Sequence, residues 1–186
     1  ISVPAELRGA AYGCFALAGD KSILDSVRAD LAGTDGVARA AASRWLGTLV
    51  GPSAIGELKE LLVDGNEQVR QNAAFSIGEL KSLAMIPHLD QGLRDISPEV
   101  KLETVRALSK LQNNEVAEIV QFLAFDPDIR IRQETLNILG EAKHVATLST
   151  LDNLLSDSDL GIRFHALIAI MDTDLNRGKT AFRRAL

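Results

Sequence analysis

Basic side chains recur at a fixed interval along this sequence, and they are the first residues in it whose spacing could serve a chemical purpose. Six of them lie 31 residues apart with no insertion: Arg8, Arg39, Arg70, Lys101, Arg132 and Arg163. A row of cations could follow a nucleic-acid backbone, because that binding depends on Lys and Arg contacts to phosphates. The same row could instead be buried and paired with carboxylates, since a buried cation is costly without a partner.

The surroundings of these cations favour pairing within the fold. If each cation lies on a helix, with ~100° between successive residues, it falls inside the arc of the apolar positions around it. An aspartate stands six residues before four of the cations, at Asp64, Asp95, Asp126 and Asp157, whereas Gly33 has that place before Arg39. We therefore predict that the cations form structural pairs with these upstream aspartates and do not bind phosphates.

Histidine and cysteine do not fall into a catalytic or metal-binding pattern. The three histidines are His88, His144 and His165, and none belongs to a His-Glu-x-x-His motif. Cys14 is the single cysteine, so neither a cysteine cluster nor an internal disulfide can form. We predict no catalytic residue, no metal and no cofactor. The lack of a disulfide favours a reducing compartment, and we expect a cytoplasmic protein that is not an enzyme.

The composition argues against two classes of partner. The net charge is -5 and the pI is about 5.2, which disfavours nucleic acid as the main partner. No apolar run approaches the ~20 residues that a membrane-spanning helix needs. The sequence is 46% hydrophobic but only 4% aromatic, so small and aliphatic side chains must build the core. We expect neither a nucleic-acid partner nor a membrane.

The interval of 31 residues also governs the positions around the cations. Seven residues after each cation stands a large apolar side chain: Phe15, Leu46, Ile77, Leu108, Leu139 and Ile170. The next position is small in five copies, as Ala16, Gly47, Gly78, Ser109 and Gly140, and Met171 is the exception. A fixed period of this length indicates stacked units, none of which can bury its apolar face alone.

Each unit contains two predicted helices, which we call A and B in chain order. Helix A has apolar residues at offsets of three and seven, such as Ile55, Leu58 and Leu62, and this spacing places them on one face. Before helix B stands a column of capping residues: Asp35, Asn66, Ser97, Asp128 and Asp159. Such side chains accept hydrogen bonds from the free N–H groups of a first helical turn. Nothing alternates with a period of two, so we predict no strands.

The repeated run resembles the short HEAT-like repeats found in phycobilisome lyases and in many bacterial and archaeal proteins. The matching residues are Asp64, Val69, Arg70, Ala73, Ala74, Ile77 and Gly78. The resemblance covers nearly the whole chain and implies an all-α, right-handed superhelical solenoid of 31-residue helix-turn-helix repeats. It also implies that the Asp–Arg pairs form a structural ladder between units. The His-Glu dipeptides that bind iron in HEAT-like deoxyhypusine hydroxylases are missing.

We expect residues 1–186 to form one HEAT-like repeat domain. It would comprise a half repeat at 1–19 with a lone B-type helix, five repeats at about 20–172, and a half repeat at 173–186 with a lone A-type helix. The first residue is Ile1 and not Met, and the chain begins and ends in mid-repeat. We therefore expect a fragment of a longer protein, with flanking domains or further repeats of the same protein as its neighbours.

The outer arc of helix B carries residues that vary from unit to unit, as a surface that binds a non-repeating partner would require. The resemblance implies that the B helices line a concave groove. Phe75, Leu102 and Phe164 are apolar where solvent is expected, and Arg44 and Arg106 flank them. The predicted protein-binding groove comprises Arg44, Asn72, Phe75, Leu102, Glu103, Arg106, Glu134, Asn137, Phe164 and His165.

These features predict a non-catalytic scaffold that binds a protein or peptide segment on the B helices. Acids on the outer arc outnumber bases by five to three: Glu79, Glu103, Glu134, Glu141 and Asp172 against Arg44, Arg106 and Lys110. This balance favours a polar or basic segment. The alternative, raised by the resemblance, is an accessory domain of a bilin lyase-like enzyme that handles a chromophore-bearing protein. Visible absorbance from a bound tetrapyrrole would distinguish the two.

Overall fold

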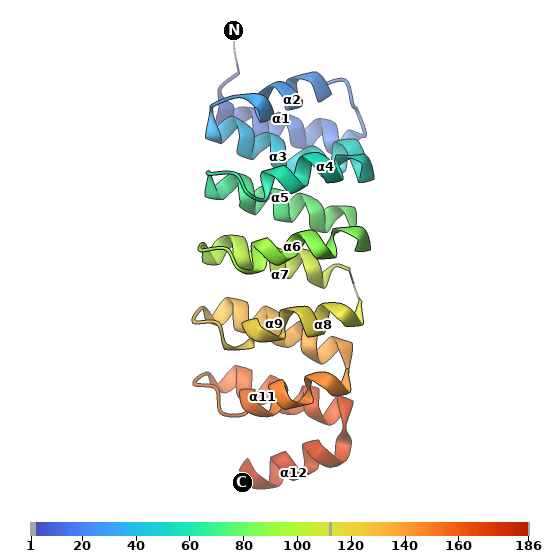
Figure 1. Cartoon of the computed structure of the whole chain (residues 1–186), viewed down its shortest axis with the longest axis vertical. Helices are drawn as coiled ribbons and strands as arrows, with labels where there is room; N and C mark the ends of the chain where they lie inside the picture. Colours follow the sequence, from blue (N-terminus) through green and yellow to red (C-terminus); the bar gives the residue numbers. More distant parts are fainter. Residues whose placement is uncertain (1–2, 112, 186) are drawn as a thin grey trace. The chain divides into compact units, whose positions relative to one another are not determined.

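The chain folds into stacked pairs of helices. The computed structural model describes residues 3–111 and 113–185, and every regular element in these two ranges is helical. The chain divides into two compact units, residues 1–111 and 112–186, and both repeat the same A-then-B arrangement of helices (Figure 1). The prediction of an all-α solenoid of helix-turn-helix repeats is confirmed.

The first unit has a row of B-type helices with A-type helices packed against them. The B-type helices are α1 (Ala5–Ala18), α3 (Gly36–Val50), α5 (Glu67–Leu80) and α7 (Pro98–Ser109). The A-type helices are α2 (Leu24–Ala32), α4 (Ile55–Leu61) and α6 (Ile86–Leu93), with 3-10 turns η1 (Gly51–Ala54) before α4 and η2 (Leu83–Met85) before α6. Successive B-type helices pack side by side, and each A-type helix packs on the B-type helix that follows it (Figure 1).

The second unit continues the same alternation. Its B-type helices are α9 (Ile129–Ala142) and α11 (Leu160–Thr173), and its A-type helices are α8 (Asn114–Val120), α10 (Leu148–Leu154) and α12 (Leu175–Ala185). The 3-10 turns are η3 (Gln121–Phe125) after α8 and η4 (Val145–Thr147) before α10. Helix α11 packs against α9, α10 and α12. The predicted lone helices at the two ends correspond to α1 and α12.

The predicted column of capping residues is confirmed at every B-type helix from α3 to α11. The side chain of each capping residue accepts a hydrogen bond from a backbone N–H in the first turn: Asp35, Asn66, Ser97, Asp128 and Asp159. A polar cap satisfies one of the N–H groups that a helix leaves free at its start. Each of these B-type helices therefore begins with the same kind of capping hydrogen bond.

The small residues near the middle of the B-type helices allow those helices to approach closely. A methyl group added to Gly47 of α3 would lie 2.6 Å from the carbonyl oxygen of Ser76 on α5. One added to Gly78 of α5 would lie 2.8 Å from the Cα atom of Ala107 on α7. The Gly47 N–H also donates to the Ser76 hydroxyl oxygen at 2.7 Å. A larger side chain at Gly47 or Gly78 would push neighbouring repeats apart.

The periodic arginines form a ladder between repeats, but the predicted pairing with the upstream aspartates is wrong. Arg70 donates to both carboxylate oxygens of Asp95, 25 residues downstream, at 2.7 and 2.9 Å. The residue six positions upstream, Asp64, contributes its backbone carbonyl, which accepts from Arg70 Nη1 at 2.9 Å. Arg39 repeats the pattern with Asp64 and the Gly33 carbonyl, as does Arg132 with Asp157 and the Asp126 carbonyl. The carboxylate thus comes from the next repeat, so each of these ion pairs joins two successive repeats.

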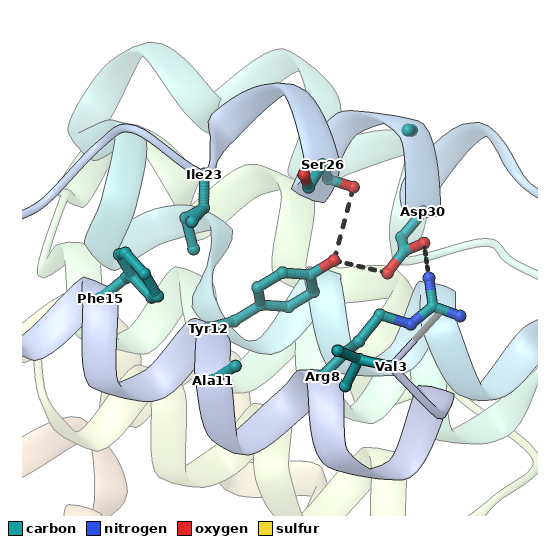
Figure 2. A pocket seen from close by; sticks show the side chains of 9 residues that line it. Val3, Arg8, Ala11, Tyr12, Phe15, Ile23, Ser26 and Asp30 are labelled. Carbon is teal, nitrogen blue, oxygen red and sulfur yellow. Dashed lines mark hydrogen bonds and ion pairs between the residues drawn. The ribbon is translucent and has the colours of Figure 1, made fainter. Parts of the chain in front are cut away.

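The first repeat replaces the missing aspartate at Gly33 with a different carboxylate. Asp30 lies one helical turn earlier on α2, and it pairs with Arg8 of α1 and accepts the Tyr12 hydroxyl at 2.6 Å (Figure 2). Tyr12 is 4% exposed and Asp30 is 9% exposed. Burial, the hydrogen bond to Asp30 and the negative charge of Asp30 raise the pKa of Tyr12 to about 12. A three-residue cluster therefore ties α1 to α2 where the regular ladder has no carboxylate.

We predict that Asp95→Asn destabilises the protein by about 3 kcal/mol at neutral pH, because breaking a largely buried ion pair leaves Arg70 without its counter-charge. Burial raises the pKa of Asp95, but hydrogen bonds from Arg70 and from the Ser97 N–H outweigh it, so the pKa lies below its usual value. The stabilisation is therefore present above the unfolded pKa of about 3.9 and is lost as the pH falls through the folded pKa. Urea denaturation across pH 2 to 7 measures both effects.

Asp90→Asn is the matched control for the ladder. Asp90 pairs with Arg94 at 3.2 Å, but the two side chains are 56% and 65% exposed. An exposed pair contributes about 0 to 1 kcal/mol, so this variant is expected to unfold almost like the wild type. Equal losses of stability in the two variants would contradict a structural role for the ladder.

We predict that the single tyrosine titrates near pH 12 in the folded protein. Tyr12 is the only tyrosine in the sequence, so tyrosinate absorbance at about 295 nm reports this residue alone. In urea the midpoint should fall to about 10, the usual value. The pKa of Tyr12 is higher in the folded than in the unfolded protein, so the free energy of unfolding should decrease as the pH rises from about 10 towards 12. The Tyr12→Phe variant should not show this decrease. A midpoint near 10 in the folded protein would contradict a buried phenol bonded to Asp30.

Candidate protein-binding surface

The predicted groove residues all lie on B-type helices, and we call their outward side the B surface. The first unit contributes Arg44 on α3, Asn72 and Phe75 on α5, and Leu102, Glu103 and Arg106 on α7. The second unit contributes Glu134 and Asn137 on α9, and Phe164 and His165 on α11. The structure places these residues on the predicted helices, but it does not expose all of them.

Phe75 lies at the centre of a stack of cations on the first unit. The guanidinium carbon of Arg44 lies 3.9 Å from the centre of the Phe75 ring, and Lys110 Nζ lies 4.8 Å from it. Lys110 also pairs with Glu79 at 2.7 Å. Contacts of this kind between a cation and a ring contribute about 0.5 to 1 kcal/mol at exposed sites. The Phe75 ring is therefore half-buried and contacted by two cations, so it is not a bare apolar anchor.

Arg106 and Glu103 continue the B surface along α7. Arg106 is exposed, whereas the Glu103 side chain is 13% exposed, and their charged groups lie 3.9 Å apart.

The predicted set omitted Lys110 and Glu79, although both stood on the predicted outer arc. Their spacing of 31 residues, the same as that between Arg44 and Phe75, is the signal that neighbouring B-type helices bring them together.

Two residues of the predicted groove are buried, so the expectation that they face solvent is wrong. Leu102 is 2% exposed and Asn72 is 7% exposed. Asn72 Nδ2 donates to the Ala40 carbonyl on α3 at 2.7 Å, and its Oδ1 accepts from Gln68 Nε2 at 3.3 Å. Leu102 follows the ladder position directly, at the edge of the arc that helix packing covers, and an aliphatic side chain there is stabilised by burial. Asn72 is a link between α3 and α5, and Leu102 belongs to the core.

The second unit has a pocket between α9 and α11 that contains two of the predicted residues, Asn137 and His165. Its volume is about 270 Å³, and its apolar lining includes Gly140, Ile168 and Ala169. Two carboxylates that the predicted set omitted, Glu141 and Asp172, complete the lining with Lys143. Lys143 Nζ lies 3.8 Å from Asp172. The pocket thus combines apolar side chains with acidic and amide groups and one ammonium group, that of Lys143.

Phe164 and Glu134 do not join that pocket. Phe164 is 58% exposed, and its ring meets His165 edge-on with the ring centres 5.8 Å apart. Together with Ile168 of α11 and Phe182 of α12 it lines a second pocket of about 230 Å³. Glu134 is half-buried on α9. Phe164 is therefore the one predicted apolar residue that remains open to solvent.

The described part of the chain offers no alternative centre for metal chemistry. Among residues 3–111 and 113–185, no group of three or more His, Cys, Asp and Glu side chains could hold a metal ion. No helix in these ranges is both long enough and apolar enough to cross a lipid bilayer.

Comparisons with known proteins agree with the repeat architecture. Residues 57–121 match the family model for HEAT repeats. A chain of the CpcE–CpcF complex of phycocyanin lyase from Nostoc sp. PCC7120 aligns over 80% of this chain with 19% identity and a TM-score of 0.66, and the alignment covers 64% of that longer chain. A designed armadillo repeat protein, solved in complex with the peptide (KR)4, aligns over 91% of this chain and 90% of its own, with 18% identity and a TM-score of 0.66.

These likenesses concern the fold, because the identities are low. An engineered protein also aligns over 94% of this chain and 89% of its own, at 18% identity and a TM-score of 0.64. No curated protein sequence shows significant similarity to the chain.

We predict that Asn72 stabilises the fold, whereas Asn137 does not. Asn72→Ala removes the bond from Nδ2 to the Ala40 carbonyl, and although the Ser43 hydroxyl still donates to that carbonyl at 3.0 Å, the lost link between α3 and α5 should cost about 1 kcal/mol. Asn137 is exposed on α9, so Asn137→Ala should change the free energy of unfolding by less than about 0.5 kcal/mol. Urea denaturation of the two variants measures both values. A similar, small loss of stability in both variants would mean that Asn72 is not needed for packing α3 against α5.

Proposed function

We propose that the chain is a HEAT-like, non-catalytic scaffold that binds a protein segment on its B surface. The observation that carries this proposal is a difference between two sets of positions on the B-type helices. Positions that pack or cap keep their chemical type from repeat to repeat, whereas the outer positions change, as from Arg44 to Phe75 to Arg106. A surface built from side chains that differ in each repeat can recognise a partner whose own sequence does not repeat.

The charges of the second unit favour a basic side chain in that partner. Glu141 and Asp172 line the pocket between α9 and α11 together with the apolar side chains of Ile168 and Ala169. The aliphatic stem of a lysine or arginine can pack on such apolar side chains while its cationic end meets the carboxylates. The first unit offers the opposite charge around Phe75, where Arg44 and Lys110 are gathered. The segment we propose is therefore polar and of mixed charge, with at least one basic residue.

We propose that this binding takes place in the cytoplasm, because a chain whose single cysteine is Cys14 cannot rely on an internal disulfide and disulfides are rare in reducing compartments. Flanking domains or further repeats of the same protein are proposed as additional neighbours.

The proposal predicts that a protein captured from the source cell's lysate is lost when the B surface is altered. The bait for the test is the triple variant Arg44→Glu, Phe75→Ala and Arg106→Glu, which reverses two charges and removes the stacked ring. Interface energy is concentrated in a few aromatic and arginine residues, so capture should fall at least about tenfold, the effect of ~1.4 kcal/mol. Quantitative mass spectrometry of the captured proteins provides the measurement.

The control, which we call the A-helix control, makes equivalent changes on α4 or just after α4 and α6: Lys59→Glu on α4, Val63→Ala after α4, and Arg94→Glu at the C-cap of α6. These three residues are exposed, so the control tests whether changed charge alone disturbs capture. A further bait, Glu141→Gln with Asp172→Asn, tests the acidic pocket without changing its shape. Capture that survives the B-surface variant but not the A-helix control would refute the proposed location. Capture by none of the folded baits would refute the scaffold function.

A further inference from the structure

The contact between α5 and α7 shows how a lysine side chain packs across two successive B-type helices. Lys110 of α7 has its Nζ atom 2.7 Å from Glu79 Oε1 of α5 and 4.8 Å from the centre of the Phe75 ring. A methyl group added to Gly78 would lie 3.4 Å from Lys110 Cδ, so the stem of this lysine passes over the glycine. The lysine is therefore held at two points, with a glycine under its stem and a carboxylate at its end.

The contact between α9 and α11 repeats these surroundings without the lysine. The equivalent residues, two repeats later, are Gly140 for Gly78, Glu141 for Glu79, Ala169 for Ala107 and Asp172 for Lys110. A methyl group added to Gly140 would have Ala169 Cβ, at 3.3 Å, as its one described neighbour within 4 Å beyond its own helix backbone. No long side chain lies over Gly140, and the pocket of about 270 Å³ opens there.

The apolar part of the pocket suits the stem of a lysine. Leu136 and Ile168 line it together with Gly140 and Ala169. A lysine packs its stem along such apolar surface while its charged end stays among polar groups. Pockets that enclose a whole small ligand have volumes of about 300 Å³ or more, so this smaller pocket fits a single side chain of a larger partner.

The polar part of the pocket suits an ammonium group. Glu141 lines it and has no ion-pair partner among residues 3–111 and 113–185. Asp172 has Lys143 Nζ 3.8 Å away, but both side chains are more than half exposed. Asn137 stands in the place of Phe75 and adds an amide oxygen to the lining. A lysine ammonium carries three donors, and these two carboxylates and one amide can accept all three.

We propose that the α9–α11 pocket binds a lysine side chain of the partner segment, with the stem over Gly140 and the ammonium group between Glu141 and Asp172. Lysine is the occupant because the chain itself places a lysine over the equivalent glycine and carboxylate of α5. A guanidinium has five donors in a rigid fork and would leave some of them without an acceptor here. The inference rests on the proposed function, since it names the side chain that this part of the B surface takes.

The pocket is tested with the peptide Ac-Ser-Gly-Lys-Gly-Ser-NH2, titrated into the whole protein at constant ionic strength and followed by two-dimensional amide NMR. The signals of Gly140 and Glu141 should shift and saturate. Matched peptides carry norleucine, Nε-acetyllysine or arginine in place of the lysine. The first two keep the stem without the charge, so they should bind at least about tenfold more weakly, because charge-assisted hydrogen bonds are lost.

The variant Asp172→Lys fills the pocket with a lysine of the chain itself. Its new side chain stands in the place of Lys110 and can pair with Glu141 as Lys110 pairs with Glu79. A cation near the C-terminal end of α11 is also favoured by the helix dipole, so the variant should fold. It should weaken binding of the lysine peptide at least about tenfold. The control Asp25→Lys makes the same change of charge at an exposed residue of α2 and should leave binding within about twofold of the wild type.

Capture from the lysate separates this inference from the proposed function. A partner that is lost with the Arg44, Phe75 and Arg106 triple variant but kept by Asp172→Lys would leave the scaffold function standing and contradict the lysine pocket. If no protein is captured, the proposed function fails, and the peptide titration still decides whether the pocket takes a lysine.

Three results of the titration would overturn the inference. The first is no saturable shift at Gly140 and Glu141 with the lysine peptide up to about 50 mM, well beyond the millimolar range of weak binding. The second is equal binding of the norleucine peptide, or tighter binding of the arginine peptide, which would assign the pocket to another side chain. The third is equal binding by the Asp172→Lys and Asp25→Lys proteins, which would place the peptide elsewhere.

Discussion

The bidentate contact between an arginine of one repeat and an aspartate of the next is the interaction on which the regularity of the chain depends. Arg70 bonds both oxygens of Asp95, and Asp95 Oδ1 also accepts the Ser97 N–H at 2.8 Å. Ser97 in turn caps α7. One carboxylate thus holds the preceding B-type helix, the turn in which it lies and the capping residue of the following helix. A single inserted residue between Arg70 and Asp95 would change the position of all three, which gives a physical reason for a period without insertions.

Most of the fold follows from the sequence because its signals are local and are repeated several times. Apolar spacing identifies the helices, and a capping residue marks the start of each B-type helix from α3 onwards. The aspartate that pairs with each periodic arginine was not predictable in the same way. Offsets of -6 and +25 differ by the period itself, so both lead to a residue in the same aspartate column. Spacing alone cannot tell which copy supplies the carboxylate, since that depends on how closely successive B-type helices approach.

The B surface was predicted less well, and the reason is geometric. A helical projection treats each helix alone, so it places Asn72 and Leu102 on an outward arc. Inside a stack, each B-type helix has neighbours beside it, and side chains at the edge of the arc are covered. Gly47 and Gly78 strengthen this effect by bringing α3, α5 and α7 close together. The period does predict which outer residues meet, because Arg44 and Phe75 occupy equivalent positions in adjacent repeats, as do Glu79 and Lys110.

The first repeat shows how this architecture tolerates a change in its central interaction. Without a carboxylate at Gly33, the chain supplies one from Asp30, at a position where later repeats have Leu61, Gly92, Leu123 and Leu154. An acid at an otherwise apolar or small position is stable only if it is satisfied, and here Arg8 and Tyr12 satisfy it. The substitution keeps α1 attached to α2 but leaves Arg8 Nε without an acceptor. The same cluster that repairs the ladder therefore makes the α1–α2 surface chemically distinct from the interior repeats.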